Sequence, residues 1–326
     1  MSTLTQSASS GLPSIEKGSS LWSDAFTRLK KNKLAMLGGI VVTLILIACF
    51  IVTPILGATG MDANAQDLSN QFAKPGTEGS ILGTDQLGRD MLMRVLEGGQ
   101  ISLLVAILST LLTVSFGIVY GGIAGYCGGK TEGIMMRIVD GLLAMPFLII
   151  VILFRELIAA RTDLIAEWLV ENWNMSSDLV LRFSNLAPLI LAIAAFGWLT
   201  MGRIVRTAAA SLRRQEFVEA ARSLGLPHHR ILFRHILPNM LGPVIIYATL
   251  TIPSFILYEA TLSFIGLGIE PPNSSWGILI KEGANFLETN PIILAIPAVL
   301  FSITLFAFNF LGDGLRDALD PKSSKD

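Results

Sequence analysis

Long apolar runs separated by short polar segments dominate this chain of 326 residues. A helix needs about 20 mostly apolar residues to cross the hydrocarbon core of a bilayer. Six runs reach or nearly reach this length: 34–56, 101–120, 134–154, 187–204, 242–257 and 291–311. We therefore predict an all-α, polytopic membrane protein with six transmembrane helices.

The polar residues between these runs indicate how the rest of the chain is organised. Trp22, Phe26 and Leu29 recur at helical spacing with basic residues opposite, which fits an amphipathic helix in the membrane plane and equally a plain basic anchor. The predicted divisions are a flexible polar tail at 1–20, an amphipathic cytoplasmic helix at 21–33, a first span at 34–56, an outer loop at 57–100, a five-helix core at 101–320 that contains the polar segment 205–239, and a cytoplasmic tail at 321–326.

Lysine and arginine set the orientation of the predicted spans. Most of the 24 Lys and Arg residues precede the first span, follow the fourth span or end the chain, and such residues stay on the cytoplasmic side of a membrane. Six crossings place both ends of a chain on one side. Both termini are therefore predicted to be cytoplasmic, together with the polar segment between the fourth and fifth spans.

Composition narrows the classes of function. Hydrophobic residues make up 52% and charged residues 15% of the chain, against roughly 25% charged in an average soluble domain. Cys49 and Cys127 lie in or beside apolar runs, and His228, His229 and His235 share one short polar loop without a cysteine or carboxylate at metal-ligand spacing. These positions give no basis for a disulfide framework or a metal site. The net charge of only -1 gives no basis for a nucleic-acid partner.

The stretch AGYCGGKT at 124–131 partly matches a phosphate-binding loop. Such a loop works when a strand precedes it and a helix follows it within a parallel sheet. Here a predicted transmembrane helix precedes it, and no soluble domain supplies a sheet. We expect the chain to bind no nucleotide and no other cofactor itself.

Glycines inside the predicted spans indicate close helix packing. Gly117, Gly121, Gly125 and Gly129 fall four apart and form a smooth strip at the end of the second span. Small residues at this spacing let a neighbouring helix approach closely. The neighbour is either another helix of this chain or a partner subunit.

Polar residues and prolines within the spans are few. Asp140 and Asn309 are the polar residues most apt to matter, because polar groups at membrane depth usually face a cavity or a partner. Asp140 lies one turn after Arg137, so we expect a local ion pair. Pro146 interrupts the third span and Pro253 the fifth, where packed neighbours can satisfy the freed carbonyls.

The segment EFVEAARSLGLPHHRILFRHILPN at 216–239 is basic, helix-prone and flanked by apolar runs. Phe217, Ala220, Ala221 and Leu224 recur at i, i+3, i+4 and i+7, which gives a narrow apolar face. The alanines leave this face flat. It fits a plug for a cytoplasmic socket on a partner, and equally an amphipathic hairpin packed on lipid headgroups.

A turn is predicted in the middle of this segment. Gly225 offers the left-handed conformation in which helices often end. Pro227 prevents simple continuation and suits the first turn of a new helix. The segment is therefore predicted to form a helix, a sharp turn and a second helix.

Several stretches of the chain resemble a known family. EAARSLG followed by HILPN is similar to the cytoplasmic signature of permease subunits of bacterial ABC importers, in which Glu219, Ala220, Ala221 and Gly225 hold the marked positions. The form RHILPN is that of the dipeptide/oligopeptide/nickel branch. Further similar stretches are LGTDQLGRD at 82–90, LSFIGLG at 262–268, PPNSSWG at 271–277 and LGDGLRDALDP at 311–321. The resemblance, to the second (C-type) of two permease subunits, extends over about 22–321.

The resemblance implies a type I ABC importer permease in the bacterial inner membrane, forming half of a translocation pathway. The implied partners are a second homologous permease subunit, two cytoplasmic ABC ATPase subunits that use ATP and Mg, an extracytoplasmic substrate-binding protein and membrane lipid, without nucleic acid. The chain is then a transport subunit and not an enzyme. The residues that the resemblance assigns to ATPase coupling are Glu216, Phe217, Glu219, Ala220, Ala221, Leu224, Gly225 and Pro227.

The resemblance also assigns a role to the outer stretch, which would receive the binding protein or close the cavity mouth. The residues concerned are Gly83, Thr84, Asp85, Gly88, Arg89 and Asp90. The chain departs from the family nearby, with Met93 and Gln100 where a serine and an arginine are usual. The second outer loop, at 155–186 with an interfacial helix near 165–173, is longer than is usual and could alter docking.

The cargo stays open at this stage. Dipeptides or oligopeptides are expected from the resemblance, while nickel chelates, glutathione, antimicrobial peptides or oligosaccharides could use the same architecture. A membrane enzyme has little support, because no paired nucleophile and base stand out in the sequence. A structural membrane scaffold would not need the hinged segment at 216–239.

Overall fold

The structure, a computed structural model, describes residues 21–319 except 78, 174–175 and 271–272. The predicted tails at 1–20 and 321–326 lie outside the described residues. The helices, in chain order, are α1 (Leu21–Lys31), α2 (Lys33–Ile47), the π-helix η1 (Ala48–Val52), α3 (Thr53–Ala58), the 3-10 helix η2 (Leu68–Asn70), α4 (Met91–Cys127), α5 (Gly129–Leu143), α6 (Phe147–Trp173), α7 (Ser177–Leu212), α8 (Glu216–Ser223), α9 (His228–Ile231), the π-helix η3 (Leu232–Ile236), α10 (Leu237–Asn239), α11 (Leu241–Phe264), α12 (Trp276–Ala284) and α13 (Pro291–Leu319).

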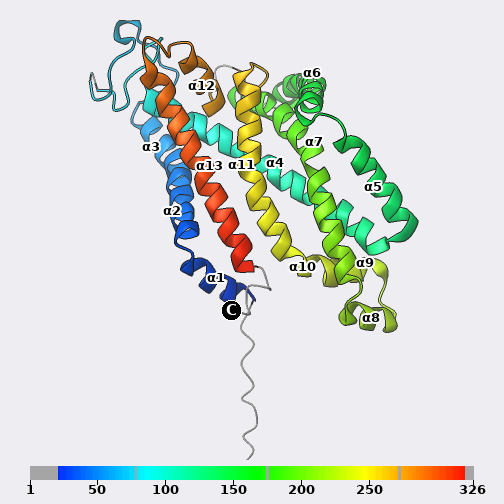
Figure 1. Cartoon of the computed structure of the whole chain (residues 1–326). Helices are drawn as coiled ribbons and strands as arrows, with labels where there is room; N and C mark the ends of the chain where they lie inside the picture. Colours follow the sequence, from blue (N-terminus) through cyan, green and yellow to red (C-terminus); the bar gives the residue numbers. More distant parts are fainter. Residues whose placement is uncertain (1–20, 78, 174–175, 271–272, 320–326) are drawn as a thin grey trace, which may run out of the picture.

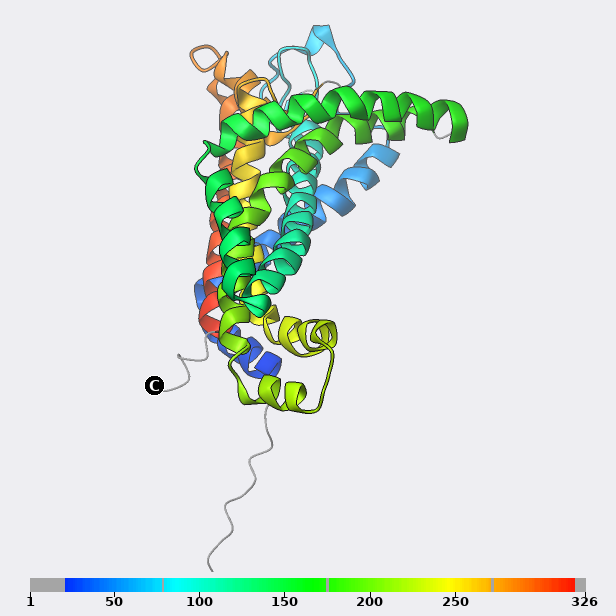
Figure 2. The ribbon, with the colours of Figure 1, turned by 90° about the vertical axis from the view of Figure 1, so that its right-hand side faces the viewer.

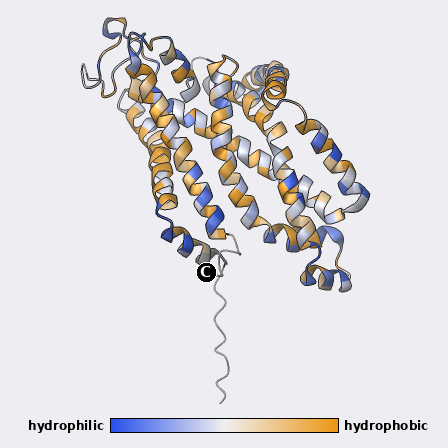
Figure 3. Ribbon diagram, in the orientation of Figure 1, coloured by the Kyte–Doolittle hydropathy of each residue, from blue (hydrophilic) through white to orange (hydrophobic). Residues whose placement is uncertain are grey.

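Five helical segments among the described residues are long and apolar enough to cross a membrane. They are Lys33–Ala58, Met91–Cys127, Ser184–Leu212, Leu241–Phe264 and Pro291–Leu319, and hydrophobic residues line most of their length in Figure 3. α5 and α6 make a sixth if the two are counted as one bent span. The predicted all-α, polytopic class is confirmed.

The long helices run side by side, so that the molecule has two distinct ends (Figure 1). α1, α8 and the last turn of α13 lie at one end, which we name the α8 end. The loop between α3 and α4 lies with α12 at the opposite end, the α12 end. The predicted amphipathic helix at 21–33 corresponds to α1, which is separated from α2 at Asn32, whose side chain caps α2.

The predicted third span, 134–154, is not one continuous helix. α5 ends at Leu143 and α6 begins at Phe147, and their axes differ by 91°. Pro146 explains the break, because proline has no N–H to donate and disfavours a helical residue before it. Its carbonyl instead accepts from the Ile150 N–H at 3.2 Å and so opens α6.

α4 begins before the predicted second span, so the predicted outer loop 57–100 ends at Asp90. The Asp90 side chain caps the helix by accepting from the Met93 N–H at 2.9 Å. Gly98 and Gly99, which lie before the predicted second span, serve close packing inside α4. A Cβ on Gly99 would lie 2.7 Å from the ring of Trp276, whose position no local pattern reveals.

The predicted outer loop 155–186 is also mostly helical, since α6 and α7 occupy it. Arg155 is buried on α6 and donates to the Gly268 carbonyl and to Glu270, both at 3.0 Å. These contacts pair the charge of Arg155, the residue at which the outer loop was predicted to begin. Figure 2 shows α6 extending sideways across the α12 end, with the predicted interfacial stretch near 165–173 in its last turns.

The glycine strip packs against α7 of the same chain. A Cβ on Gly121 would collide with the Gly202 carbonyl oxygen and lie 2.8 Å from the Val205 Cβ, and Gly117 and Gly125 meet α7 in the same way. The fourth member of the predicted strip, Gly129, has open space where a Cβ would be. The strip therefore fixes how closely α4 and α7 approach near the α8 end.

A Gly121→Ala substitution should destabilise the fold through this contact. The new methyl group meets backbone on α7, which cannot move aside as a side chain can, so we expect a loss of roughly 1–3 kcal/mol in the free energy of unfolding. Thermal melting of the purified chain measures it. Gly133→Ala on α5 is the control, because open space surrounds that Cβ position. Equal melting temperatures for the two variants would contradict the packing.

Candidate functional site

α8 is a short helix that projects from the α8 end after α7 stops at Leu212 (Figure 1). Gln215 precedes it in an extended conformation, with φ -82° and ψ 147°. Glu216 and Glu219 lie in the first turn, and Arg222 lies in the last turn. This order of charges favours the helix, because acids suit the positive end of the helix dipole and bases the negative end.

The predicted helix, sharp turn and helix is confirmed. Gly225 has φ +74°, the left-handed conformation predicted for it. Its N–H donates to the Arg222 carbonyl at 2.9 Å, and the Leu226 N–H donates to the Ala221 carbonyl at 3.2 Å. This pair of bonds is a Schellman motif, which closes the end of a helix and fixes the direction of the chain after it.

Pro227 then starts the second helix of the pair. It is extended, with φ -67° and ψ 146°, and its carbonyl accepts from the Arg230 N–H at 2.9 Å and from the Ile231 N–H at 3.1 Å. α9, η3 and α10 continue directly from this point to Asn239. Gly225 and Pro227 together hold α8 and α9 at a defined angle.

The two faces of α8 differ from the predicted ones. Val218 and Ala221 are buried against the bundle, in one apolar cluster with Ile231 and Ile236 of the following helices. Ala221 was predicted on the face offered to a partner, and that assignment is wrong, because the residue turns toward its own chain. α8 has four apolar residues, Phe217, Val218, Ala220 and Ala221, and either pair of them could face the bundle. Val218 packs in the buried cluster, which turns Ala221 inward with it.

The remaining predicted residues form the exposed side of α8. Phe217 is 39% exposed and Leu224 is 81% exposed, and Ala220 between them is exposed as well. We name Phe217, Ala220 and Leu224 the outer face of α8. A large exposed leucine is costly to hydrate, so such a face is typical of a contact surface.

Contacts to the long helices hold the α8 to α9 elbow in place. The Tyr126 hydroxyl of α4 lies 2.7 Å from His228 Nδ1, and the Arg222 guanidinium lies 5.3 Å from the centre of the Tyr126 ring. Arg213 donates to the Cys127 carbonyl at 3.0 Å. Sequence reasoning missed Tyr126, because its partners are about 100 positions away and no local pattern indicates the contact.

At the α12 end, Asp85 organises a network of charges. It is fully buried and accepts from Arg89 Nε and Arg94 Nη1, each at 2.7 Å. Arg94 also donates to Glu282 of α12 at 2.7 Å, and Arg89 lies 3.4 Å from the same carboxylate. The predicted outer-loop residues Asp85 and Arg89 therefore join the outer loop to α12, through two residues, Arg94 and Glu282, that sequence reasoning did not select.

The other predicted outer-loop residues also act inside the chain. The Thr84 hydroxyl accepts from the Ala73 N–H at 2.9 Å, and Asp90 accepts from the Ser80 hydroxyl at 2.7 Å and caps α4. Gly83 and Gly88 have φ +82° and +72°, with backbone of the same loop where a Cβ would be. All six residues are buried or half-buried, so they shape this end and offer little surface.

Met93 and Gln100, the two residues that depart from the family pattern, both make contacts inside the chain. Met93 is buried. The Gln100 side-chain amide donates to the Cys49 carbonyl at 2.6 Å, and Cys49 lies in the π-helix η1, where the regular helical hydrogen bonds are interrupted. Gln100 thus ties α4 to the first span.

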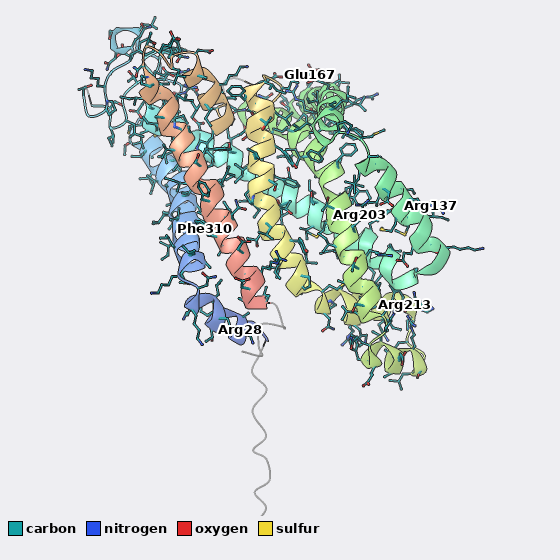
Figure 4. The ribbon with its side chains drawn as sticks, viewed as in Figure 1. Arg28, Arg137, Glu167, Arg203, Arg213 and Phe310 are labelled. Carbon is teal, nitrogen blue, oxygen red and sulfur yellow. The ribbon has the colours of Figure 1, made fainter. Side chains whose placement is uncertain are left out.

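Polar groups within the spans differ from those expected. Asp140 of α5 forms its ion pair with Arg203 of the neighbouring helix α7 and not with Arg137 of its own helix; Figure 4 shows Arg203 on α7 and Arg137 on α5. Asn309 donates to the Leu305 carbonyl of its own helix at 2.8 Å. Within the described spans, the fully buried carboxyl group is that of Glu259, which sequence reasoning did not select.

Glu259 on α11 is fully buried among hydroxyl groups. Ser102 of α4 donates to its Oε2 at 2.6 Å, and Ser263 donates to its Oε1 at 2.7 Å. Ser102 also accepts from the Trp276 N–H, at 3.2 Å, where α12 begins. The carboxyl group therefore joins three helices. The sequence signal that could have pointed to it is a Glu followed by a Ser one turn later within an apolar run.

Glu259→Ala should destabilise the chain. It leaves two buried hydroxyl groups without their acceptor, at a cost of roughly 1–3 kcal/mol each when a buried group stays unsatisfied. Melting of the purified chain measures the loss, with Glu259→Gln expected to keep most of the stability because its amide oxygen still accepts. The exposed Glu288 supplies the control, Glu288→Ala. A melting temperature of Glu259→Ala equal to that of this control would refute the role.

Comparisons with known proteins place the chain in a family. The sequence model of the family described as binding-protein-dependent transport system inner membrane component matches residues 117–325. The model of the N-terminal TM domain of oligopeptide transport permease C matches residues 20–75. The chain belongs to the binding-protein-dependent permease family.

Individual relatives agree with the family assignment over nearly the whole permease. It is 42% identical to the oligopeptide transport system permease protein OppC of Haemophilus influenzae, over 94% of this chain and 90% of the relative. It is 43% identical to OppC of Escherichia coli strain K12, over 94% and 93%. It is 38% identical to the dipeptide transport system permease protein DppC of Bacillus subtilis, over 92% and 85%.

Family membership fixes several properties of the permease. It is a multi-pass inner membrane protein, and it works with a binding protein and an ATPase as separate components. The permease is the membrane component and not itself the ATPase. Members of this family bind no cofactor themselves.

Proposed function

We propose that this permease is the C-type subunit of an ATP-driven importer of dipeptides or oligopeptides, and that α8 is the helix through which a cytoplasmic ATPase drives it. The observation that carries the proposal is the outer face of α8, an exposed apolar surface on an elbow held by the Schellman turn and by Tyr126. The peptide cargo rests on the names of the OppC and DppC relatives.

The orientation follows from charge. Arg213, Arg214, Arg222, Arg230 and Arg234 gather on the elbow and the turn before it, and such residues stay on the cytoplasmic side. α1 and the last turn of α13 lie at the same end (Figure 1). Both termini and α8 are then cytoplasmic, and the α12 end faces outward.

The assembly consists of this permease, a second homologous permease, two ABC ATPase subunits and an extracytoplasmic binding protein. α8 sits in a groove of one ATPase, with Phe217, Ala220 and Leu224 as its apolar contacts. ATP-driven closure of the ATPase pair moves α8, and the attached helices rock between inward and outward openings. ATP shifts the permease only by the difference between its binding free energies in the two states. A flexible elbow would not transmit this difference from the ATPase to the membrane helices, so a stiff elbow is needed.

At the outer side, the network around Asp85 orders the loop that meets the binding protein. Asp85 and its neighbours are buried, so they set the shape of the loop. The contacts themselves come from side chains at its surface such as Leu68 and Ile81, each 65% exposed. Deleting 83–90 removes this shape and is expected to weaken docking. A higher dissociation constant of the binding protein for the importer would show it.

The experiment that tests the role of the elbow is Gly225→Val. Valine is strained at φ +74°, by about 1–3 kcal/mol, so the Schellman turn opens and the angle between α8 and α9 is lost. In the reconstituted importer we expect peptide-stimulated ATP hydrolysis to fall severalfold toward the basal rate, with the permease still inserted. Gly242→Val is the control, because open space surrounds that position. Full stimulation of the Gly225→Val importer would count against the proposal.

A further inference from the structure

A cavity of about 560 Å³ lies behind α8, between the ends of α4, α5 and α7. Arg206, Arg213, Arg214 and Arg222 line it, together with two acids, Glu132 and Glu219. We propose that this cavity binds a phosphate-bearing anion, namely the headgroup of an anionic phospholipid. The volume is in the range of ordinary ligand sites, and Figure 4 shows Arg213 near the end of α7, close to α8.

The arginines are not neutralised by their own neighbours. Glu132 pairs with Arg206, yet Arg206 Nε is buried with no hydrogen-bond partner among the described residues. Arg213 uses one donor for the Cys127 carbonyl, out of the five N–H groups of a guanidinium. Four arginines against two glutamates leave positive charge and free donors, and guanidinium forks match the oxygens of a phosphate group.

Part of the cavity lining consists of glycines, which carry no side chain. Gly125, Gly128 and Gly129 line it, and Gly128 and Gly129 have φ +68° and +57°, conformations open to glycine. α5 begins at Gly129 with the positive end of its dipole at the cavity. The stretch AGYCGGKT, which resembles a phosphate-binding loop in the sequence, therefore supplies an anion-compatible wall without the sheet of a nucleotide site.

The position of the cavity favours a lipid over a free anion. It lies where α4 and α7 end and α5 begins, and α5 exposes Ile134 and Ile138, which acyl chains can cover. Basic pockets between membrane helices on the cytoplasmic side are suited to anionic headgroups. Because Arg213 and Arg222 also hold the elbow, a bound headgroup would brace α8, and this last consequence rests on the function proposed above.

Binding is tested on the intact importer in nanodiscs, by native mass spectrometry of retained phosphatidylglycerol in a phosphatidylcholine background. We expect retention by the wild type and about tenfold weaker retention by the double variant Arg213→Gln, Arg214→Gln, because charge-assisted hydrogen bonds are lost. Arg230→Gln, an exposed arginine outside the cavity, should retain lipid like the wild type. A double lysine variant, which keeps the charge, should retain an intermediate amount and report that the elbow is folded.

Three results would overturn the proposal. Equal retention by wild type and the glutamine variant would place the lipid elsewhere. Displacement of the lipid by an equal concentration of inorganic phosphate would assign the cavity to a free anion. Retention by the permease alone but exclusion from the importer would assign it to an acidic side chain of the ATPase. None of these readouts uses ATP hydrolysis, so lipid binding can fail while α8 still couples, and the reverse.

Discussion

Replacing Ala220 with arginine is expected to abolish the peptide-stimulated ATP hydrolysis of the assembled importer and to leave the permease folded. Ala220 lies between Phe217 and Leu224 on the outer face of α8, and it is exposed in the isolated permease. The new side chain therefore meets only water in the permease. In the importer it enters the apolar contact that we propose between α8 and the ATPase, where an unpaired charge costs several kcal/mol, enough for a loss of more than about 100-fold in coupled activity.

Ser223→Arg is the matched control for this substitution. Ser223 is exposed on the same short helix but outside the outer face, so the variant adds the same charge without entering the contact. We expect hydrolysis close to that of the wild type. Normal peptide-stimulated hydrolysis by Ala220→Arg, measured with purified ATPase, partner permease and binding protein, would remove the outer face from the coupling contact.

Asp85→Ala is expected to be the most damaging substitution at the α12 end. Asp85 is fully buried and neutralises Arg94, whose side chain is only 4% exposed. Removing one partner of a buried ion pair costs roughly 3–5 kcal/mol, because the other charge stays buried. Glu282 continues to hold part of that charge, which places the expected loss at the lower end of this range.

The loss should appear as a lower melting temperature and as protease cleavage between α3 and α4, since the network holds this loop on α12. Asp62→Ala is the control, as Asp62 is exposed in the same loop and its carboxylate accepts from the Asn64 N–H at 2.9 Å. Raising the salt concentration should not mimic Asp85→Ala, because a buried pair is poorly screened. A melting temperature like that of Asp62→Ala would show that the network contributes little.

The sequence allowed the long spans and the elbow to be predicted, because both depend on local pattern. Apolar length is enough to find 34–56 or 291–311. Gly225 and Pro227 mark the turn after α8 through backbone preferences that act within a few residues. These features would form in the same way in many folds.

Features that depend on distant residues could not be predicted. Gly99 was placed in the outer loop 57–100, but it lies in α4 and packs on the ring of Trp276. Arg155 was placed in the second outer loop, but it lies in α6 and donates to Gly268 and Glu270. Asp140 had a nearby candidate in its own helix, yet α7 provides the partner. In each case the deciding contact comes from a segment far along the chain.

In the candidate site, too, the features set by local sequence were predicted and those set by distant contacts were not. The residues of the elbow were found from a short motif, and the side that α8 turns to the bundle was not. Ala221 and Ala220 are adjacent and chemically identical, so only the packing of Val218 on α9 separates the buried alanine from the exposed one. Tyr126 was missed because its partner His228 comes from another helix, and Glu259 because Ser102 of α4 is the partner that ties it to the rest of the bundle.

The central claim is that the outer face of α8 touches the ATPase in the working importer. A photo-crosslinking amino acid at Leu224, which is 81% exposed, tests it most directly. The same amino acid at Ile134, an exposed residue of α5 that we propose faces lipid, is the control. The account predicts adducts between residue 224 and the ATPase whose yield changes when ATP is added, and adducts with lipid alone at residue 134. Adducts of residue 224 with lipid or with the permease alone, in an importer that is transporting peptide, would contradict it.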